Sequence, residues 1–436
     1  MQPLTFKTDN MPPTELCPPQ SKIHWPSALQ FGLCTLAAVV LLGLALLTTL
    51  IGFGQLMGGP STSGDATSTF LLAAGIALTG VLALPSVVLS LLRLLGRSEP
   101  TSQWLAHLSK GILAFLILAF IVELLIGGSV SGNSSLSWLI LPPIQVLAVG
   151  LPVLFLVYLA VHGLPRGSSQ RTWGVFDSGL VIAPTLIIIL ELGALIVFGL
   201  VGLIIIANQP DLIREFQRLA QSFQNGTPPP GEVLRLISPY LESPGFIFAA
   251  FVFMAVVVPL IEELIKPAGV WLLAGRHLTP AEGFAAGVLS GAGYALVENL
   301  GATTSMDSWA FLVLVRACTG VMHIFTAGLM GWAIVTAWNQ RRYLRLGVAY
   351  LTAVVIHGLW NGLALFVGVA SLPPLPQPIS IFTSQREIPA ILGMVVLIVI
   401  VFILLVWSNR ALRRAIIPQL QSPGITPGPV PQDHIP

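Results

Sequence analysis

Two adjacent glutamates interrupt an apolar segment and are followed one helical turn later by a lysine. Glu262, Glu263 and Lys266 stand in the run FVFMAVVVPLIEELIKPAGVWLL. Ionisable side chains inside a membrane span are costly, so a group of three is expected to have a function. In a helix Lys266 lies four residues from Glu262 and three from Glu263, so its ammonium can pair with either carboxylate. The segment therefore predicts a polar site inside a membrane helix.

Three later apolar segments carry comparable groups. A helix rises about 1.5 Å per residue. On this basis Glu298, His323 and His357 lie roughly 16–24 Å from the expected cytoplasmic ends of their helices, at the same depth as the glutamate pair. A shared depth predicts that these side chains converge on one cavity instead of facing lipid. The pairs are Tyr294 and Glu298 in GYALVEN, Arg316 and His323 in RACTGVMH, and His357 and Asn361 in HGLWN.

Small residues favour an inward orientation of Glu298. Gly283, Gly287 and Gly291 recur every four residues, on the helical stripe that continues to Glu298. Such stripes allow two membrane helices to approach closely. We therefore expect this helix to lie inside the bundle, with Glu298 directed at other polar groups.

Prolines on both sides of the glutamate pair predict a kink. Pro267 cannot donate a hydrogen bond to the carbonyl of Glu263, and Pro259 disturbs the turn before the pair. The freed backbone carbonyls then need water or side chains as partners.

The composition indicates a membrane protein. The chain is 55% hydrophobic and only 9% charged, with a mean hydropathy of +0.87, beyond the range of soluble domains. Cys17, Cys34 and Cys318 lie far apart, so neither a disulfide framework nor a thiolate zinc site is indicated. The formal net charge is +2 and there is no basic run, which gives no indication of a nucleic-acid partner.

We predict an all-α, polytopic transmembrane helical bundle with about ten spans. Basic residues collect on alternate connecting loops, for example Arg93 and Arg97, then Arg166 and Arg171, which predicts cytosolic N- and C-termini. The expected spans are 27–52, 69–94, 108–128, 136–162, 179–207, 246–275, 282–303, 309–337, 346–369 and 387–408.

The predicted organisation separates a nearly uncharged half from a polar half. Glu123 and Glu191 are the ionisable exceptions in the first half, and we interpret them as isolated packing groups or groups that reach toward the membrane surface. The parts are a cytosolic polar segment 1–26, a five-helix membrane region 27–207, an extracytosolic loop 208–245 with an amphipathic helix, a core 246–370, the final span with its flanks 371–416, and a disordered, proline-rich cytosolic tail 417–436.

Carboxylates and histidines in a semi-enclosed site fit hydrolysis. A carboxylate can take a proton from water, with Glu262 as the first choice, while histidine and asparagine donate hydrogen bonds to the oxyanion. His323, His357 and Glu298 could instead hold zinc and leave one position for water. Since no HExxH is present, we expect no metal cofactor, with activity that survives chelation, and keep zinc as the alternative.

At these residues the sequence resembles the PrsW family of intramembrane proteases, related to the CAAX-protease and bacteriocin-processing membrane proteins. The resemblance covers roughly residues 245–370 and includes a tyrosine where phenylalanine is more usual. It implies proteolysis of membrane-embedded or membrane-proximal proteins by a glutamate-activated water. The matching motifs are EExxK at Glu262, Glu263 and Lys266, an aromatic-xxx-Glu pair at Tyr294 and Glu298, a histidine at His323, and HxxxN at His357 and Asn361.

On this interpretation the protein is an integral, multi-pass peptidase of a prokaryotic cell membrane. Its expected partners are a membrane-protein substrate and the lipid bilayer, without nucleic acid, and its oligomeric state is open. A proton-coupled or metal transporter is an alternative, although transporters often show two similar halves. A catalytically silent scaffold is another. The expected catalytic residues are Glu262, Glu263, Glu298, His323 and His357, supported by Lys266, Asn361, Tyr294 and Arg316.

Overall fold

The structure, a computed structural model, describes residues 24–58, 63–97, 109–131, 135–207, 244–302, 309–370 and 387–421, with the single positions 214, 217, 220 and 221. In these ranges the chain forms helices and no β-strand, as expected. Of the amphipathic helix predicted within 208–245, the structure describes only the helical positions 214, 217, 220 and 221, and the segment 1–23 lies outside the described residues. The helices are α1 (Trp25–Met57), α2 (Ser63–Leu94), α3 (Lys110–Ser131), α4 (Ser137–Val161), α5 (Ser169–Asp177), η3 (Ser178–Ile182), α6 (Ala183–Ala207), α9 (Pro244–Val252), η4 (Phe253–Val257), α10 (Val258–Ile265), α11 (Ala268–Trp271), α12 (Pro280–Ala302), α13 (Trp309–Gln340), α14 (Tyr343–Ala370) and α15 (Glu387–Gln421).

Nine helical stretches of the described chain are long and apolar enough to cross a membrane, which confirms a polytopic helical membrane protein. Two of these stretches contain a π-helical segment, since α5, η3 and α6 form one and α9, η4, α10 and α11 form another. The remaining expected span, 282–303, corresponds to α12, which is not among the nine. Every α12 residue from Gly283 to Leu296 is buried, so this helix needs no apolar surface for lipid.

The last helix differs from the expected boundary. Residues 417–421, which we assigned to a disordered tail, are the end of α15, whereas 422–436 lie outside the described residues. The run of alanine, leucine and arginine that leads into this end is rich in strong helix formers.

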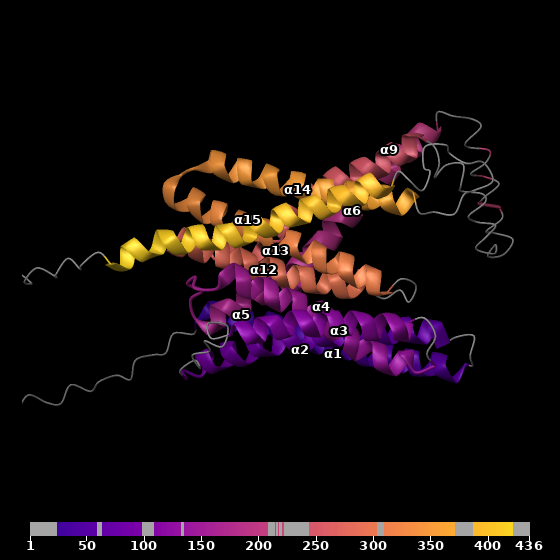
Figure 1. The fold of residues 1–436 in the computed structure, drawn as a ribbon, viewed down its shortest axis with the longest axis horizontal. Helices are drawn as coiled ribbons and strands as arrows, with labels where there is room; N and C mark the ends of the chain where they lie inside the picture. Colours follow the sequence, from indigo (N-terminus) through magenta and orange to yellow (C-terminus); the bar gives the residue numbers. More distant parts are fainter. Residues whose placement is uncertain are drawn as a thin grey trace, which may run out of the picture.

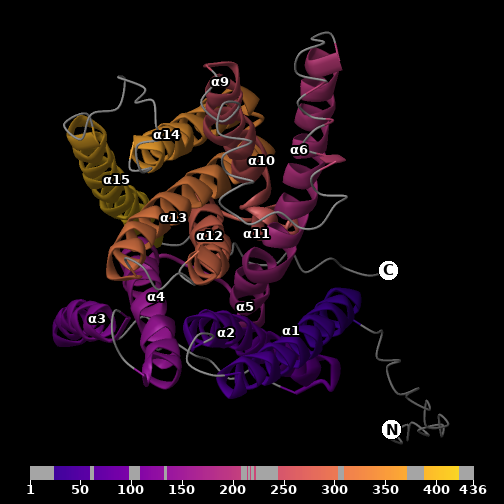
Figure 2. The ribbon, with the colours of Figure 1, turned by 90° about the vertical axis from the view of Figure 1, so that its right-hand side faces the viewer.

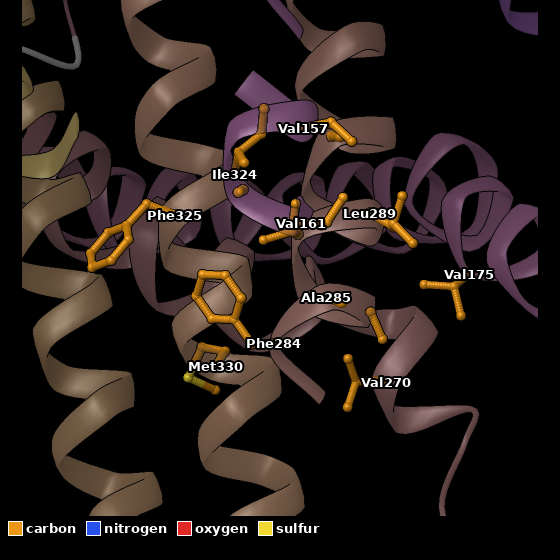
Figure 3. Close-up of a cluster of buried hydrophobic side chains, with 14 of the residues drawn as sticks. Val157, Val161, Val175, Val270, Phe284, Ala285, Leu289, Ile324, Phe325 and Met330 are labelled. Carbon is orange, nitrogen blue, oxygen red and sulfur yellow. The ribbon is translucent and has the colours of Figure 1, made fainter. Parts of the chain in front are cut away.

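The helices form layers around α12. In Figure 1, α12 and α13 run side by side between a lower layer of α1 to α4 and an upper layer that includes α14 and α15. Figure 2, viewed from the end, shows α12 enclosed by α13, α4, α5 and α11. The main hydrophobic core follows from this arrangement: Phe284, Ala285 and Leu289 of α12 pack with side chains of α4, α5, α11 and α13 (Figure 3).

Glycines bring the α12 and α13 backbones into contact. A Cβ atom at Gly287 would overlap the carbonyl of Ala327 on α13, and one at Gly331 would overlap the carbonyl of Gly283. The close approach predicted from the glycine stripe is therefore present. Because these helices carry Glu298 and His323, the contact also fixes the distance between two polar groups of the site.

Candidate active site

Lys266 is the centre of the polar site. Its Nζ lies 2.7 Å from Glu263 Oε1 and 3.0 Å from Glu262 Oε2. The same nitrogen lies 2.5 Å from Nδ1 of His323 and 3.3 Å from Nδ1 of His357. All five residues are buried. Helices α10, α13 and α14 thus meet at one ammonium group inside the bundle.

His357 is oriented by a carboxylate. Its Nδ1 lies 2.8 Å from Glu263 Oε1 and 3.3 Å from Lys266 Nζ, and we assign the proton to Nδ1 because the carboxylate, which only accepts, is the closer of the two. The free Nε2 lone pair then faces Glu262 Oε2 at 3.9 Å. This separation is too long for a direct hydrogen bond and is compatible with a water that bridges the two atoms.

His323 has the opposite arrangement. A lysine ammonium only donates, so Nδ1 of His323 accepts from Lys266 and its proton resides on Nε2. That Nε2 is 2.5 Å from Glu298 Oε2, although the two are not aligned as a hydrogen bond. Glu298 Oε1 is in turn 2.6 Å from a terminal nitrogen of Arg316, whose Nε donates to Asn299 Oδ1 at 3.0 Å. Glu298 therefore links His323 to a second cation, the half-buried guanidinium of Arg316.

Tyr294 packs against this centre. Its ring meets that of His323 edge-on at 5.3 Å between centroids, and Lys266 Nζ lies 5.1 Å from the tyrosine ring centre. The rings of His323 and His357 are also edge-on, with centroids 5.3 Å apart. These contacts restrict rotation of both imidazoles.

Unsatisfied polar atoms concentrate at the same place. Among the described residues, nine buried side-chain atoms lack an aligned hydrogen-bond partner, and five of them belong to this site. Native proteins rarely leave such groups unpaired, so their clustering marks a position for water, an ion or a substrate. The five atoms are Glu262 Oε2, Glu263 Oε2, Glu298 Oε2, Arg316 NH2 and His323 Nε2.

The kinked span that carries the glutamates is held by side chains from α14. The π-helical segment η4 and Pro259 interrupt regular helical hydrogen bonding just before the pair. Asn361 Nδ2 donates to the carbonyl of Met254 at 3.0 Å, and the Tyr350 hydroxyl donates to that of Leu260 at 2.7 Å. Asn361 thus acts on the backbone that leads to the glutamates.

Carbonyls after the pair are also satisfied. Beyond Pro267, Ser290 Oγ of α12 donates to the carbonyl of Lys266 at 2.6 Å. Trp271 Nε1 donates to the carbonyl of Leu264 at 2.9 Å. Side chains therefore bind several carbonyls around the glutamate pair, although the carbonyl of Glu263, which Pro267 was expected to free, is not one of them.

Glu191, which the sequence suggested to be an isolated group, lies close to the site. Ile187, one turn earlier on α6, is buried in a cluster with Tyr294. Glu191 also interacts electrostatically with Glu262 and Glu298. The spacing of Ala183, Ile187 and Glu191, four residues apart, was the available signal for a common inward face.

A zinc site fits the donor types, but the hydrogen-bond partners of one histidine do not favour it. One ligand atom each from Glu262, His323 and His357 lies within 4.8 Å of the others, and two histidines with a glutamate form a known catalytic zinc set. This grouping has Glu262 where we had considered Glu298. His357 is held by a carboxylate, as zinc ligands usually are. His323 is not, because its Nδ1 faces an ammonium and its proton occupies Nε2.

A buried cluster of carboxylates and histidines, enclosed by helices long and apolar enough to cross a membrane, is the kind of site that an intramembrane hydrolase needs. Residues 173–407, more than half of the chain, match the family model described as PrsW family intramembrane metalloprotease. The chain belongs to this family, and it is a multi-pass membrane peptidase that acts on membrane-protein substrates. The match extends beyond residues 245–370 and takes in the fifth and the last spans. No curated protein and no solved structure matches the chain.

Proposed function

We propose that this peptidase cleaves membrane-embedded or membrane-proximal proteins with a water molecule that Glu262 deprotonates. The main observation in support is the gap of 3.9 Å between Glu262 Oε2 and His357 Nε2. Glu262 Oε2 is buried and lacks an aligned hydrogen bond, so it is available to a water molecule in that gap. A general base must lie within such reach of the proton that it removes.

The neighbouring residues have separate roles in this proposal. Glu262 takes a proton from water as the oxygen attacks the scissile carbonyl carbon, and returns that proton to the leaving amine when the C–N bond breaks. Lys266 compensates the charges of Glu262 and Glu263, and Glu263 holds the tautomer of His357. His323 donates from Nε2 to the oxyanion.

The remaining polar residues position this set. Glu298, paired with Arg316, lies beside the His323 nitrogen that would donate to the oxyanion. Tyr294 restricts the His323 ring, and Asn361 supports the backbone before the glutamates. We assign these four residues supporting functions, because none of them is placed to activate the water as directly as Glu262.

Zinc chemistry on the same residues is the second candidate. It is supported by the family description as a metalloprotease and by the grouping of Glu262, His323 and His357. Glu262, His323 and His357 would hold the ion, which would supply a more acidic water and polarise the scissile carbonyl. Glu262 would then be a ligand, and Glu263 would become the base. We place this candidate second because His323 must first pass its Nε2 proton to Glu298 and receive one on Nδ1 from Lys266.

The test compares Glu262→Gln and Glu263→Gln with the wild type on peptides from a digested membrane proteome, in detergent micelles. We expect Glu262→Gln to lower cleavage by about two orders of magnitude or more, since the amide keeps the size but not the base. Glu123→Gln, the same change in another membrane helix, is the control and should cleave at the wild-type rate. Wild-type cleavage by both Glu262→Gln and Glu263→Gln would refute the glutamate base.

A further inference from the structure

Helix α6 carries one carboxyl group, that of Glu191, between two residues that pack against other helices of the site. Ile187 is buried with Tyr294, Ile261 and Ile265, and Phe198 meets Phe253 of η4 edge-on at 5.3 Å. Glu191 lies between Ile187 and Phe198 on α6, on the side that packs against α10 and α12. It is therefore a wall residue of the site, opposite the helix that carries the glutamate pair.

Glu191 differs from the other carboxylates of the site in its partners. Glu262, Glu263 and Glu298 each lie within 3.0 Å of a lysine or arginine nitrogen. Glu191 Oε1 is buried and has no hydrogen-bond partner among the described residues. Its electrostatic neighbours are Glu262, Glu298 and Lys266, so it approaches the centre, but it has no direct hydrogen bond to the lysine. A buried acceptor of this kind needs a donor.

The position of Glu191 is also at the border with the bilayer. Leu190 and Leu192, on either side of it, are exposed on the outer surface of α6. A membrane-embedded peptide that reaches Glu262 from this side passes between lipid and the wall formed by α6.

A peptide at the site brings the missing donor. A transmembrane helix must be locally unwound before its backbone can be cleaved, and the N–H groups freed in this way are costly in apolar surroundings unless an acceptor replaces the lost carbonyl. Both the orphaned oxygen and the orphaned N–H groups are satisfied if they meet.

We propose that Glu191 is a substrate-binding residue that accepts a hydrogen bond from a backbone N–H of the unwound substrate beside the scissile bond. This inference rests on the proposed peptidase mechanism and extends it to how the substrate is held. It makes α6 one side of the substrate-binding cleft and α10 the other.

The kinetic test uses the fastest-cleaved peptide of the membrane-proteome digest. Glu191→Leu removes the acceptor, so KM should rise about tenfold while kcat stays within about threefold, because a contact made equally in the ground and transition states affects binding alone. Glu191→Gln keeps a carbonyl acceptor and should stay within about threefold of the wild-type KM. Leu192→Ala, a lipid-facing change at the next position, is the control for general disturbance of α6.

Three results would overturn the inference. The first is a Glu191→Leu enzyme with the KM of the Leu192→Ala control. The second is a Glu191→Gln enzyme as impaired in KM as Glu191→Leu, which would show that the charge and not the acceptor is needed. The third is a loss in kcat alone, which would assign Glu191 to the chemical step.

A binding assay keeps this inference separate from the peptidase mechanism. The probe is a biotinylated polyleucine peptide of about 25 residues, long enough to span a bilayer. It carries a central Gly-Gly pair with a photoreactive leucine beside it, and it is crosslinked to the Glu262→Gln protein. Less crosslinking in Glu191→Leu/Glu262→Gln than in Leu192→Ala/Glu262→Gln supports the inference even if the wild type cleaves nothing, a result that would refute the proposed function alone. Equal crosslinking refutes the role of Glu191 in binding.

Discussion

Replacement of Lys266 by methionine should destabilise the protein more than any other single change in the site. The ammonium is fully buried and lies within 3.0 Å of carboxylate oxygens of both Glu262 and Glu263. Methionine has a similar length and no charge, so two buried carboxylates lose their nearest cation. Leaving a buried charge uncompensated costs about 3–5 kcal/mol, which lowers the folding equilibrium constant by roughly two to four powers of ten.

The assay is unfolding of the purified protein in mixed micelles of increasing SDS content, followed by fluorescence of its 10 tryptophans. Lys266→Met/Glu263→Gln should recover about 1–3 kcal/mol of the loss, because the second change removes one of the uncompensated charges. Both variants should be inactive, whereas Lys110→Met, at the start of α3, should behave as wild type. A Lys266→Met protein with wild-type stability, or a double variant whose losses simply add, would refute this account of the charge balance.

Three further outcomes are expected. Prolonged treatment with a strong zinc chelator should leave most of the cleavage activity, whereas His323→Ala should lower it at least about tenfold through loss of an oxyanion donor; activity that disappears with chelator and returns with zinc would favour the second candidate. Gly287→Ala should cost about 1–3 kcal/mol in the unfolding assay because its Cβ overlaps backbone of α13, whereas Gly199→Ala, which has open space around it, should cost little. Asn361→Ala should lower stability by about 0.5–1.5 kcal/mol through loss of its bond to the Met254 carbonyl, and an unchanged midpoint would contradict that role.

Local spacing was sufficient to predict much of the fold and the composition of the candidate site. Apolar runs of membrane-crossing length identified the helices, because the bilayer sets that length. The four-residue spacing of Gly283, Gly287 and Gly291 predicted the contact with α13, since a side-chain stripe is a property of one helix. The common depth of Glu262, Glu298, His323 and His357 likewise follows from rise per residue alone.

Contacts between helices were the part that spacing could not supply. Lys266 contacts both histidines because of how α13 and α14 are rotated about their axes. Spacing along one helix predicts only the contacts of Lys266 with the two glutamates of its own span. The place of Glu191 in the bundle has a related explanation. The spacing of Ala183, Ile187 and Glu191 indicates one face of α6, but it does not show that this face packs beside α10.

The low hydropathy of α12 has a consequence for how the chain enters the membrane. A helix stays in the bilayer on its own only if transfer of its side chains into lipid is sufficiently favourable in free energy. Because it contains several glycines and two glutamates, α12 has a lower mean hydropathy than the nine apolar stretches. Its insertion therefore depends on a partner, and α13, joined to it through residues 303–308 and in backbone contact with it, is the adjacent helix that can act in this way. Biogenesis of the catalytic half would then proceed through a helical hairpin, and truncation of the chain just after α12 should leave that helix outside the bilayer.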